Sequence, residues 1–218
     1  MGTESISLHR GAAAGADVGL ATPQYFVHMS RAAWDHEAAR FDDEPDHGLA
    51  QPEVRHAWRR LLLSVLPPAP ARVADLGCGT GTLAKLLVDE GYQVDGVDFS
   101  PEMVRRARTK APQAAFVVGD AARPCLSPSA YDVVLSRHVL WAMPDPAEAF
   151  ARWIELLRPQ GVAVLVEGHW TTGAGLTAAE SSRIVRSVRA DVAVRPLPEA
   201  VYWGKEITDE RYLIVSRR

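Results

Sequence analysis

The sequence predicts an α/β fold in which a mostly parallel β-sheet is covered by helices on both faces. Short apolar runs alternate with segments of helical periodicity between residues 73 and 167, and this alternation is typical of parallel strands joined by helices. Glycines follow the first run at every second position, as in a tight turn between a strand and a helix. The last two runs are separated by a loop, which indicates an antiparallel hairpin at the C-terminal end.

Seven strands are expected, each a short apolar run bounded by turn residues. They span residues 73–76, 93–98, 115–118, 131–136, 162–167, 192–195 and 211–215. The helices between them are expected over residues 83–90, 101–110, 147–157 and 177–189. Pro101 in a first turn supports the second helix, and Thr177 with Glu180 forms the capping box of the last.

Residues 23–68 form a helical segment ahead of the sheet. Helices are expected over 24–40 and 53–66, with an acidic loop over 42–48 between them and Pro67 ending the second. We expect this segment to be a lid over a core domain of residues 69–218. Residues 1–22 are rich in Gly, Ala and Ser, which favours a disordered tail over a signal peptide.

Composition excludes several classes of protein. The 218 residues, 47% hydrophobic, suit one medium domain with its own core. A net charge of −3 argues against a nucleic-acid binder, which needs a basic excess. No apolar stretch reaches the roughly 20 residues that span a bilayer. The two cysteines, Cys78 and Cys125, are too few for a disulfide framework and fit the cytoplasm. A monomer or homodimer without nucleic-acid or membrane partners is expected.

The motif with most chemical content is Asp75-Leu76-Gly77-Cys78-Gly79-Thr80-Gly81, after the first strand. Its glycines permit a tight turn and let a ligand approach the main chain. A dinucleotide fold requires the third glycine one residue later, where this chain has Thr82. The spacing therefore suits a nucleoside without pyrophosphate, such as S-adenosylmethionine (SAM), and Asp98 at the end of the second strand can accept hydrogen bonds from ribose hydroxyls.

These residues resemble class I SAM-dependent methyltransferases of the small bacterial type that acts on metabolites, with a Rossmann-like seven-stranded sheet. The resemblance covers residues 24–167. Its motifs are the glycine turn, Val97-Asp98-Phe99-Ser100 with Pro101 and Met103, Asp120-Ala121, and Tyr131-Asp132-Val133-Val134. Residues 157–161 resemble the family's turn before strand five, where Gln160 replaces a usual glycine.

The resemblance implies a cofactor site and no metal. Glycine-turn residues would line the methionine and ribose part of SAM, Asp98 would bind the ribose, and Ser136 and Arg137 would border the methionine end. Phe99 and Met103 would lie against adenine. The full set of implied cofactor-binding residues is Trp34, Asp75, Gly77, Cys78, Gly79, Asp98, Phe99, Met103, Asp120, Ala121, Ser136 and Arg137.

Three histidines are candidates for a base that takes a proton from the methyl acceptor. His138 leads because it follows the fourth strand, close to where the methyl group should point. His47 lies in the acidic lid loop, and His169 follows the fifth strand. We expect the lid to supply most of the acceptor pocket, since little chain remains beyond the fifth strand.

The expected activity is methyl transfer to an O or N atom of a small molecule. A composition rich in Ala, Arg, Pro and Val is typical of GC-rich genomes and, with the family type, suggests a secondary-metabolite or antibiotic precursor as acceptor. Two alternatives stay open. One is a protein that binds SAM without catalysis, and the other, disfavoured by the position of Gly81, is an NAD-dependent oxidoreductase.

Overall fold

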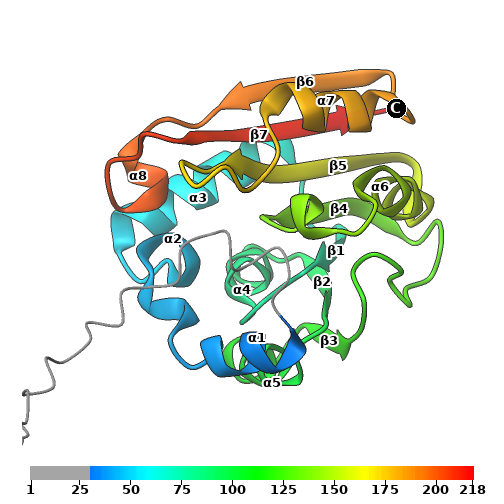
Figure 1. The fold of residues 1–218 in the computed structure, drawn as a ribbon. Coiled ribbons are helices and arrows are strands. Elements are labelled where there is room, and N and C mark those ends of the chain that lie inside the picture. The colour runs from blue at the N-terminus through cyan, green and yellow to red at the C-terminus, as the bar shows by residue number, and fades with distance from the viewer. Residues whose placement is uncertain (1–29) are drawn as a thin grey trace, which may run out of the picture.

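The computed structural model describes residues 30–218, which form a seven-stranded sheet with helices on both faces (Figure 1). The strands lie in the order β3-β2-β1-β4-β5-β7-β6. They are β1 (Arg72–Leu76), β2 (Gln93–Asp98), β3 (Ala115–Val118), β4 (Tyr131–Arg137), β5 (Leu157–His169), β6 (Asp191–Pro196) and β7 (Glu210–Arg217). The first five are parallel, and β7 runs antiparallel to both β5 and β6. The predicted fold class is therefore confirmed, including the C-terminal hairpin.

The helices form two layers around the sheet. Helices α3 (Pro52–Val65), α4 (Thr82–Asp89) and α5 (Pro101–Lys110) pack on one face, while α6 (Pro146–Glu155) and α7 (Ala178–Arg186) pack on the other. Alternate residues of β5 serve the two faces: Val164 belongs to the first core and Leu165 to the second. Such two-sided burial explains why the central strands are continuous apolar runs.

The remaining helices are short, and most of them lie near the carboxyl ends of the parallel strands. They are α1 (Arg31–Glu37), the 3₁₀ turn η2 (Phe41–Asp43), α2 (Pro45–Gly48), the 3₁₀ turn η3 (Leu140–Ala142) and α8 (Ala200–Trp203). Helix α1 lies beside α5, and α2 lies beside α8 (Figure 1). None of the helices within residues 30–218 has the length and apolarity that crossing a membrane requires.

Local structure differs from the sequence predictions at three places. The loop expected over 42–48 contains η2 and α2, since Pro45 begins a helical turn that the left-handed Leu49 ends. The strand expected over 162–167 already begins at Leu157, so the expected turn over 157–161 is paired with β4 through a register shift. The loop expected between the last two strands contains α8.

The helix expected over 24–40 is described only from its middle, where α1 begins after the N-cap Ser30. Residues 24–29 and the tail expected over 1–22 lie outside the described residues.

Trp58 of α3 joins the lid side of the core to the C-terminal helix α8. Its indole is fully buried and donates a 2.7 Å hydrogen bond from Nε1 to the carbonyl oxygen of Tyr202. It packs edge-to-face on Trp203 at 5.6 Å between ring centroids. This contact positions α8, and Trp203 in turn supports residues that line the cavity described below.

Replacing Trp58 by Phe should lower the free energy of unfolding by about 1–3 kcal/mol, because the Tyr202 carbonyl loses its donor inside the core. Urea unfolding followed by circular dichroism measures the change. Arg60→Ala, on the exposed side of the same helix, is the control and should change stability by less than about 0.5 kcal/mol. Equal stability of Trp58→Phe and the native chain would contradict the role given to this hydrogen bond.

Candidate functional site

A cavity of about 590 Å³ lies along the carboxyl ends of the parallel strands, under the lid formed by α1, η2 and α2. Its lining residues at the strand ends follow the order of the strands across the sheet. Asp120 follows β3, Asp98 ends β2, Gly77 follows β1, His138 follows β4 and Trp170 follows β5. Neighbouring strands are about 4.8 Å apart, so the cavity can hold an extended ligand with a second molecule beyond it. Open α/β sheets bind ligands at this edge.

Eleven of the twelve residues implied as cofactor-binding by sequence line this one cavity. They come from the lid and from the ends of β1, β2, β3 and β4, so the fold brings together segments from residue 34 to residue 137. Ser136 is the exception. Its side chain is fully buried within β4 and is absent from the cavity lining, because neighbouring strand residues point to opposite faces.

The glycine turn leaves the main chain bare where it faces the cavity. Gly77, Gly79 and Gly81 have φ angles of +71°, +53° and +77°, in the left-handed region that favours glycine. A Cβ on Gly77 would lie 2.3 Å from Cγ2 of Val139, so no larger residue fits there. A ligand can consequently contact the backbone of this turn directly.

The Asp98 carboxylate joins the glycine turn after β1 to the turn that follows β2. Its Oδ2 accepts a 2.9 Å hydrogen bond from Gly79 N–H, and its Oδ1 accepts one of 2.9 Å from Ser100 N–H. The side chain is buried, and burial raises its pKa. A carboxylate offers about four acceptor positions, so Asp98 keeps acceptor capacity for a hydroxyl group of a ligand.

Asp75 near the end of β1 has a buried carboxylate oxygen that lacks a hydrogen-bond donor among the described residues. The residue is 3% exposed, and its Oδ2 has no hydrogen-bond partner among the described residues. Burial raises its pKa to about 7, although the nearby Arg137 acts in the opposite direction. Buried polar atoms are rarely left unpaired, so this oxygen marks a place where a ligand N–H or O–H group would complete the bonding.

The carboxylates indicate the charge of the ligand. Asp75, Asp98 and Asp120 line the same cavity, and carboxylates that are ionised favour a cation and repel phosphates. SAM carries a sulfonium, an ammonium and ribose hydroxyls and has no phosphate. The bare glycine turn, the unpaired Asp75 oxygen and these acids therefore fit SAM.

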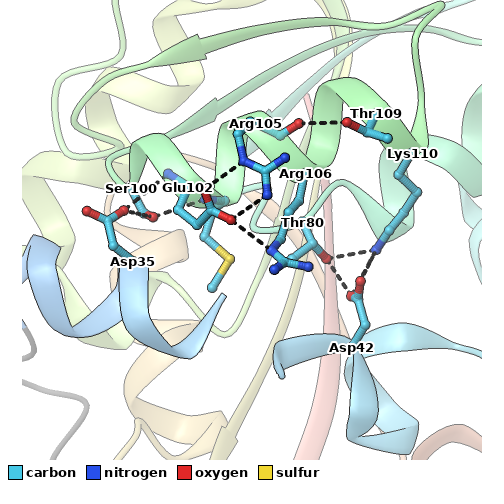
Figure 2. A network of polar contacts seen from close by, with 10 residues as sticks. Asp35, Asp42, Thr80, Ser100, Glu102, Arg105, Arg106, Thr109 and Lys110 are labelled. Atoms are coloured by element: carbon cyan, nitrogen blue, oxygen red, sulfur yellow. Dashed lines mark hydrogen bonds and ion pairs between the residues drawn. The ribbon is translucent and has the colours of Figure 1, made fainter. Parts of the chain in front are cut away.

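The lid is fastened to both ends of α5 by two aspartates (Figure 2). Asp42 accepts hydrogen bonds from Lys110 Nζ, at 2.8 Å to each carboxylate oxygen, and from the Thr80 hydroxyl. Asp35 accepts hydrogen bonds from the Ser100 hydroxyl and from Glu102 N–H at the start of α5. The lid contacts thus hold α1 and η2 over the end of the cavity that the glycine turn and Asp98 line.

Asp42 also bears on the dinucleotide alternative. Its Oδ1 accepts a 3.4 Å hydrogen bond from the hydroxyl of Thr82, the first residue of α4. Dinucleotide folds place the pyrophosphate at the N-terminus of this helix. Here a carboxylate of the chain itself lies beside that turn and is neutralised by Lys110, which disfavours NAD.

The candidate bases occupy different environments. His138 has a φ of +59° and lies between two indoles, edge-on to Trp170 at 5.3 Å and stacked on Trp203 at 5.9 Å. Burial, together with the nearby Arg211 and Arg137, lowers the pKa of His138 well below its ordinary value. Its imidazole is therefore neutral at physiological pH and accepts a proton weakly.

His47 and His169 are placed differently. His47 lines the cavity and stacks on Phe41 with 4.2 Å between ring centroids, and burial lowers its pKa. His169, the last residue of β5, is absent from the cavity lining, whereas its neighbour Trp170 belongs to it.

Arg137 lines the cavity and anchors the lid. Its guanidinium donates to the carbonyl oxygens of Asp46, at 2.7 Å, and His47, at 3.4 Å. The lid backbone thus uses these two donors of Arg137.

The C-terminal region contributes to the cavity together with the lid. Trp170, Lys205 and Arg211 line the cavity alongside residues of the lid. Sequence reasoning missed Lys205 and Arg211, since their approach to the site depends on α8 and on the pairing of β7 with β5. It also missed the lid residues Glu37 and Glu44, which carry no motif.

Comparison with known proteins agrees with the geometry of the site. A family described as "Methyltransferase domain" matches residues 74–165. A demethylmenaquinone methyltransferase of Renibacterium salmoninarum is 32% identical over 157 residues, covering 66% of each chain. The chain belongs to the class I SAM-dependent methyltransferases.

Other members of this group show how much is shared. A trans-aconitate 2-methyltransferase of Escherichia coli is 38% identical over 101 residues, or 45% of this chain and 40% of that protein. The chain thus spans two thirds or less of the length of these two curated relatives. A TehB-like SAM-dependent methyltransferase structure from Corynebacterium glutamicum superposes with a TM-score of 0.66 at 22% identity, covering 86% of this chain and 98% of that one, which shows a common fold.

The turn after β4 is held by a buried glutamate of β5. Glu167 Oε1 accepts hydrogen bonds from Val139 N–H at 3.1 Å and Leu140 N–H at 2.8 Å. The residue is fully buried, and burial raises its pKa to about 8. It therefore fixes Val139, which packs against Gly77 of the glycine turn.

Asp98→Ala should weaken the affinity for SAM or S-adenosylhomocysteine about tenfold or more, because hydrogen bonds to a charged acceptor are lost and the turn loses its tie. Isothermal titration calorimetry measures this change. Asp95→Ala, on the same strand but outside the cavity lining, should leave the affinity within about twofold. An unchanged affinity of Asp98→Ala would remove the ribose assignment.

Glu167 should make the protein less stable as pH rises. The folded carboxyl keeps its proton up to about pH 8, whereas the unfolded one ionises near 4.5. Stability contributed by this group is therefore present at low pH, falls between these values, and levels off above the folded pKa. Glu167→Gln keeps the backbone hydrogen bonds but cannot ionise. Urea unfolding at pH 6 and pH 8.5 should show a smaller difference for the variant, and an equal difference for both proteins would refute this account.

Proposed function

We propose that this protein transfers a methyl group from SAM to an oxygen or nitrogen atom of a small molecule. One observation carries the proposal. Eleven residues implied for the cofactor line a single cavity, which continues past the end of β4 into a region lined by Trp141, Trp170 and Arg211. The first part suits SAM, and the second leaves room for an acceptor.

Bound SAM supplies a methyl carbon made electrophilic by the sulfonium. The chain contributes position, since the glycine turn and Asp98 would hold the nucleoside while Trp34 and Phe41 of the lid cover it. Holding two reactants in line can replace much of the entropy cost of a bimolecular step. The contacts of Asp35 and Asp42 with α5 hold the lid over the cavity.

A hydroxyl or ammonium acceptor must lose a proton during the transfer. We propose that His138 orients the attacking atom through a hydrogen bond, because its imidazole is neutral and held rigidly between Trp170 and Trp203. His47, which also lines the cavity, is the second candidate for receiving the proton.

The relatives leave the acceptor open. One is named for demethylmenaquinone and another for trans-aconitate, which share neither shape nor charge. We propose a secondary-metabolite precursor, as the residue composition suggests. We place the reaction in the cytoplasm, where the free cysteines Cys78 and Cys125 would stay reduced.

The second candidate function is SAM binding without turnover. The lowered pKa values of His47 and His138 favour it, because neither imidazole is a strong proton acceptor. Calorimetry with S-adenosylhomocysteine, followed by transfer of radiolabelled methyl groups to panels of alcohols, phenols and amines, separates the two. Binding together with label in an acceptor supports the enzyme, and binding without label on any panel supports the alternative.

His138→Asn should lower kcat about tenfold or more with an acceptor found in that panel, while the affinity for SAM stays within about twofold. Asparagine tolerates the left-handed backbone of this position, so the loss reports on the imidazole. His169→Asn, outside the cavity lining, is the control. Native turnover of His138→Asn would move the role to His47.

A further inference from the structure

The acceptor end of the cavity is separated from the cofactor end by the order of the strands. Most of the residues implied for the cofactor lie at the ends of β3, β2 and β1, and the sheet then continues through β4 and β5 to β7. Residues at the ends of these later strands, His138, Trp170 and Arg211, also line the cavity. A second ligand beyond SAM would lie against them.

Aromatic side chains form the walls of this end. The rings of Trp141 and Trp170 are 5.0 Å apart between centroids and inclined at 59°. The Trp141 indole donates a 3.0 Å hydrogen bond to the carbonyl oxygen of His138, which fixes its orientation. Both indoles are only partly buried and line the cavity, so ring surface is available for stacking on a flat ligand.

Charged groups at this end are already paired. Arg211 is buried, lies over the rings of Trp170 and Trp203, and forms a two-pronged ion pair with Asp209 at 2.8 and 2.9 Å. Asp46 lies 3.8 Å from its Nη1. Lys205 pairs with Glu44 at 3.4 Å. An anionic acceptor would have to displace Asp209 or Asp46 from Arg211, and a cationic acceptor would have to displace Arg211 itself, which costs free energy at these buried residues.

Two imidazoles there retain hydrogen-bonding capacity. Nδ1 of His47 and Nε2 of His138 are buried and have no hydrogen-bond partner among residues 30–218. A neutral imidazole has one donor and one acceptor nitrogen. A hydroxyl group, which both donates and accepts, can satisfy either.

The walls are also held in place from behind. Trp203 is fully buried, and its ring stacks on His138 and contacts the guanidinium of Arg211. Its Nε1 donates a 2.8 Å hydrogen bond to the Leu197 carbonyl oxygen. Because these rings are held in fixed positions, a flat aromatic ligand can stack on them more closely than a saturated ring, which is thicker.

We propose that the methyl acceptor is a planar aromatic molecule with a hydroxyl group and no net charge, bound against Trp141 and Trp170 at the β4–β5–β7 end of the cavity. This assignment rests on the proposed function and names the substrate class of the same site. His138 and His47 then bind the hydroxyl, and the indoles bind the ring.

Four bicyclic probes of matched size separate planarity from charge. They are 2-naphthol, decahydro-2-naphthol, 2-naphthoate and 2-naphthylmethylammonium, each titrated calorimetrically into the full chain loaded with S-adenosylhomocysteine. We expect 2-naphthol to bind about tenfold more tightly than each of the others. Tight binding of the saturated alcohol, the anion or the cation to the same degree would overturn the proposal.

Two variants locate the binding. Trp141→Leu and Trp170→Leu should each weaken 2-naphthol about tenfold, while the weak affinity for decahydro-2-naphthol serves as the internal control and stays unchanged. Affinity for S-adenosylhomocysteine should stay within about twofold. Unchanged 2-naphthol affinity in both variants would overturn the location. Failure of the native chain to bind S-adenosylhomocysteine would instead refute the proposed function, so the two failures are distinguishable.

Discussion

The hydrogen bonds that Asp98 accepts from Gly79 and Ser100 are the interaction on which the site depends. They join the turn after β1 to the turn after β2, and each turn begins one of the helices that cover the sheet. Because Ser100 also caps α5 and its hydroxyl donates a hydrogen bond to Asp35 of the lid, one buried carboxylate links the glycine turn, the second strand and the lid.

The lid depends on the same turns, because it is attached to the helices that follow them. Its two aspartates contact the ends of α5 (Figure 2). Asp42 also accepts hydrogen bonds from Thr80 and Thr82 around the start of α4. A carboxylate beside a helix N-terminus is stabilised by the helix dipole. The chain thus uses for its own lid a position at which other nucleotide-binding folds hold phosphate, and this use is consistent with a cofactor that has none.

The proposed acceptor end is built from a different set of interactions. Ring contacts join His138 of the turn after β4 to Trp170 after β5 and Trp203 of α8, and Arg211 of β7 makes cation–π contacts with both indoles. Strand β7 pairs with β5, and this pairing places Arg211 beside Trp170. The site therefore joins a motif-rich half to a half whose residues share no local pattern, which is why the two halves were unequally predictable.

The sequence by itself determined the elements with strong local signals and picked out residues on them that line the cavity. Strand β2, helix α5 and strand β3 begin and end where the residue pattern predicts, because Ser100, Pro101 and the glycine turn impose backbone conformations through sterics and capping. Only the tertiary structure decided the burial of Ser136, the anchoring of Arg137 to the lid and the entry of Lys205 and Arg211 into the cavity. Those outcomes depend on contacts between segments far apart in the chain, and no local propensity encodes them.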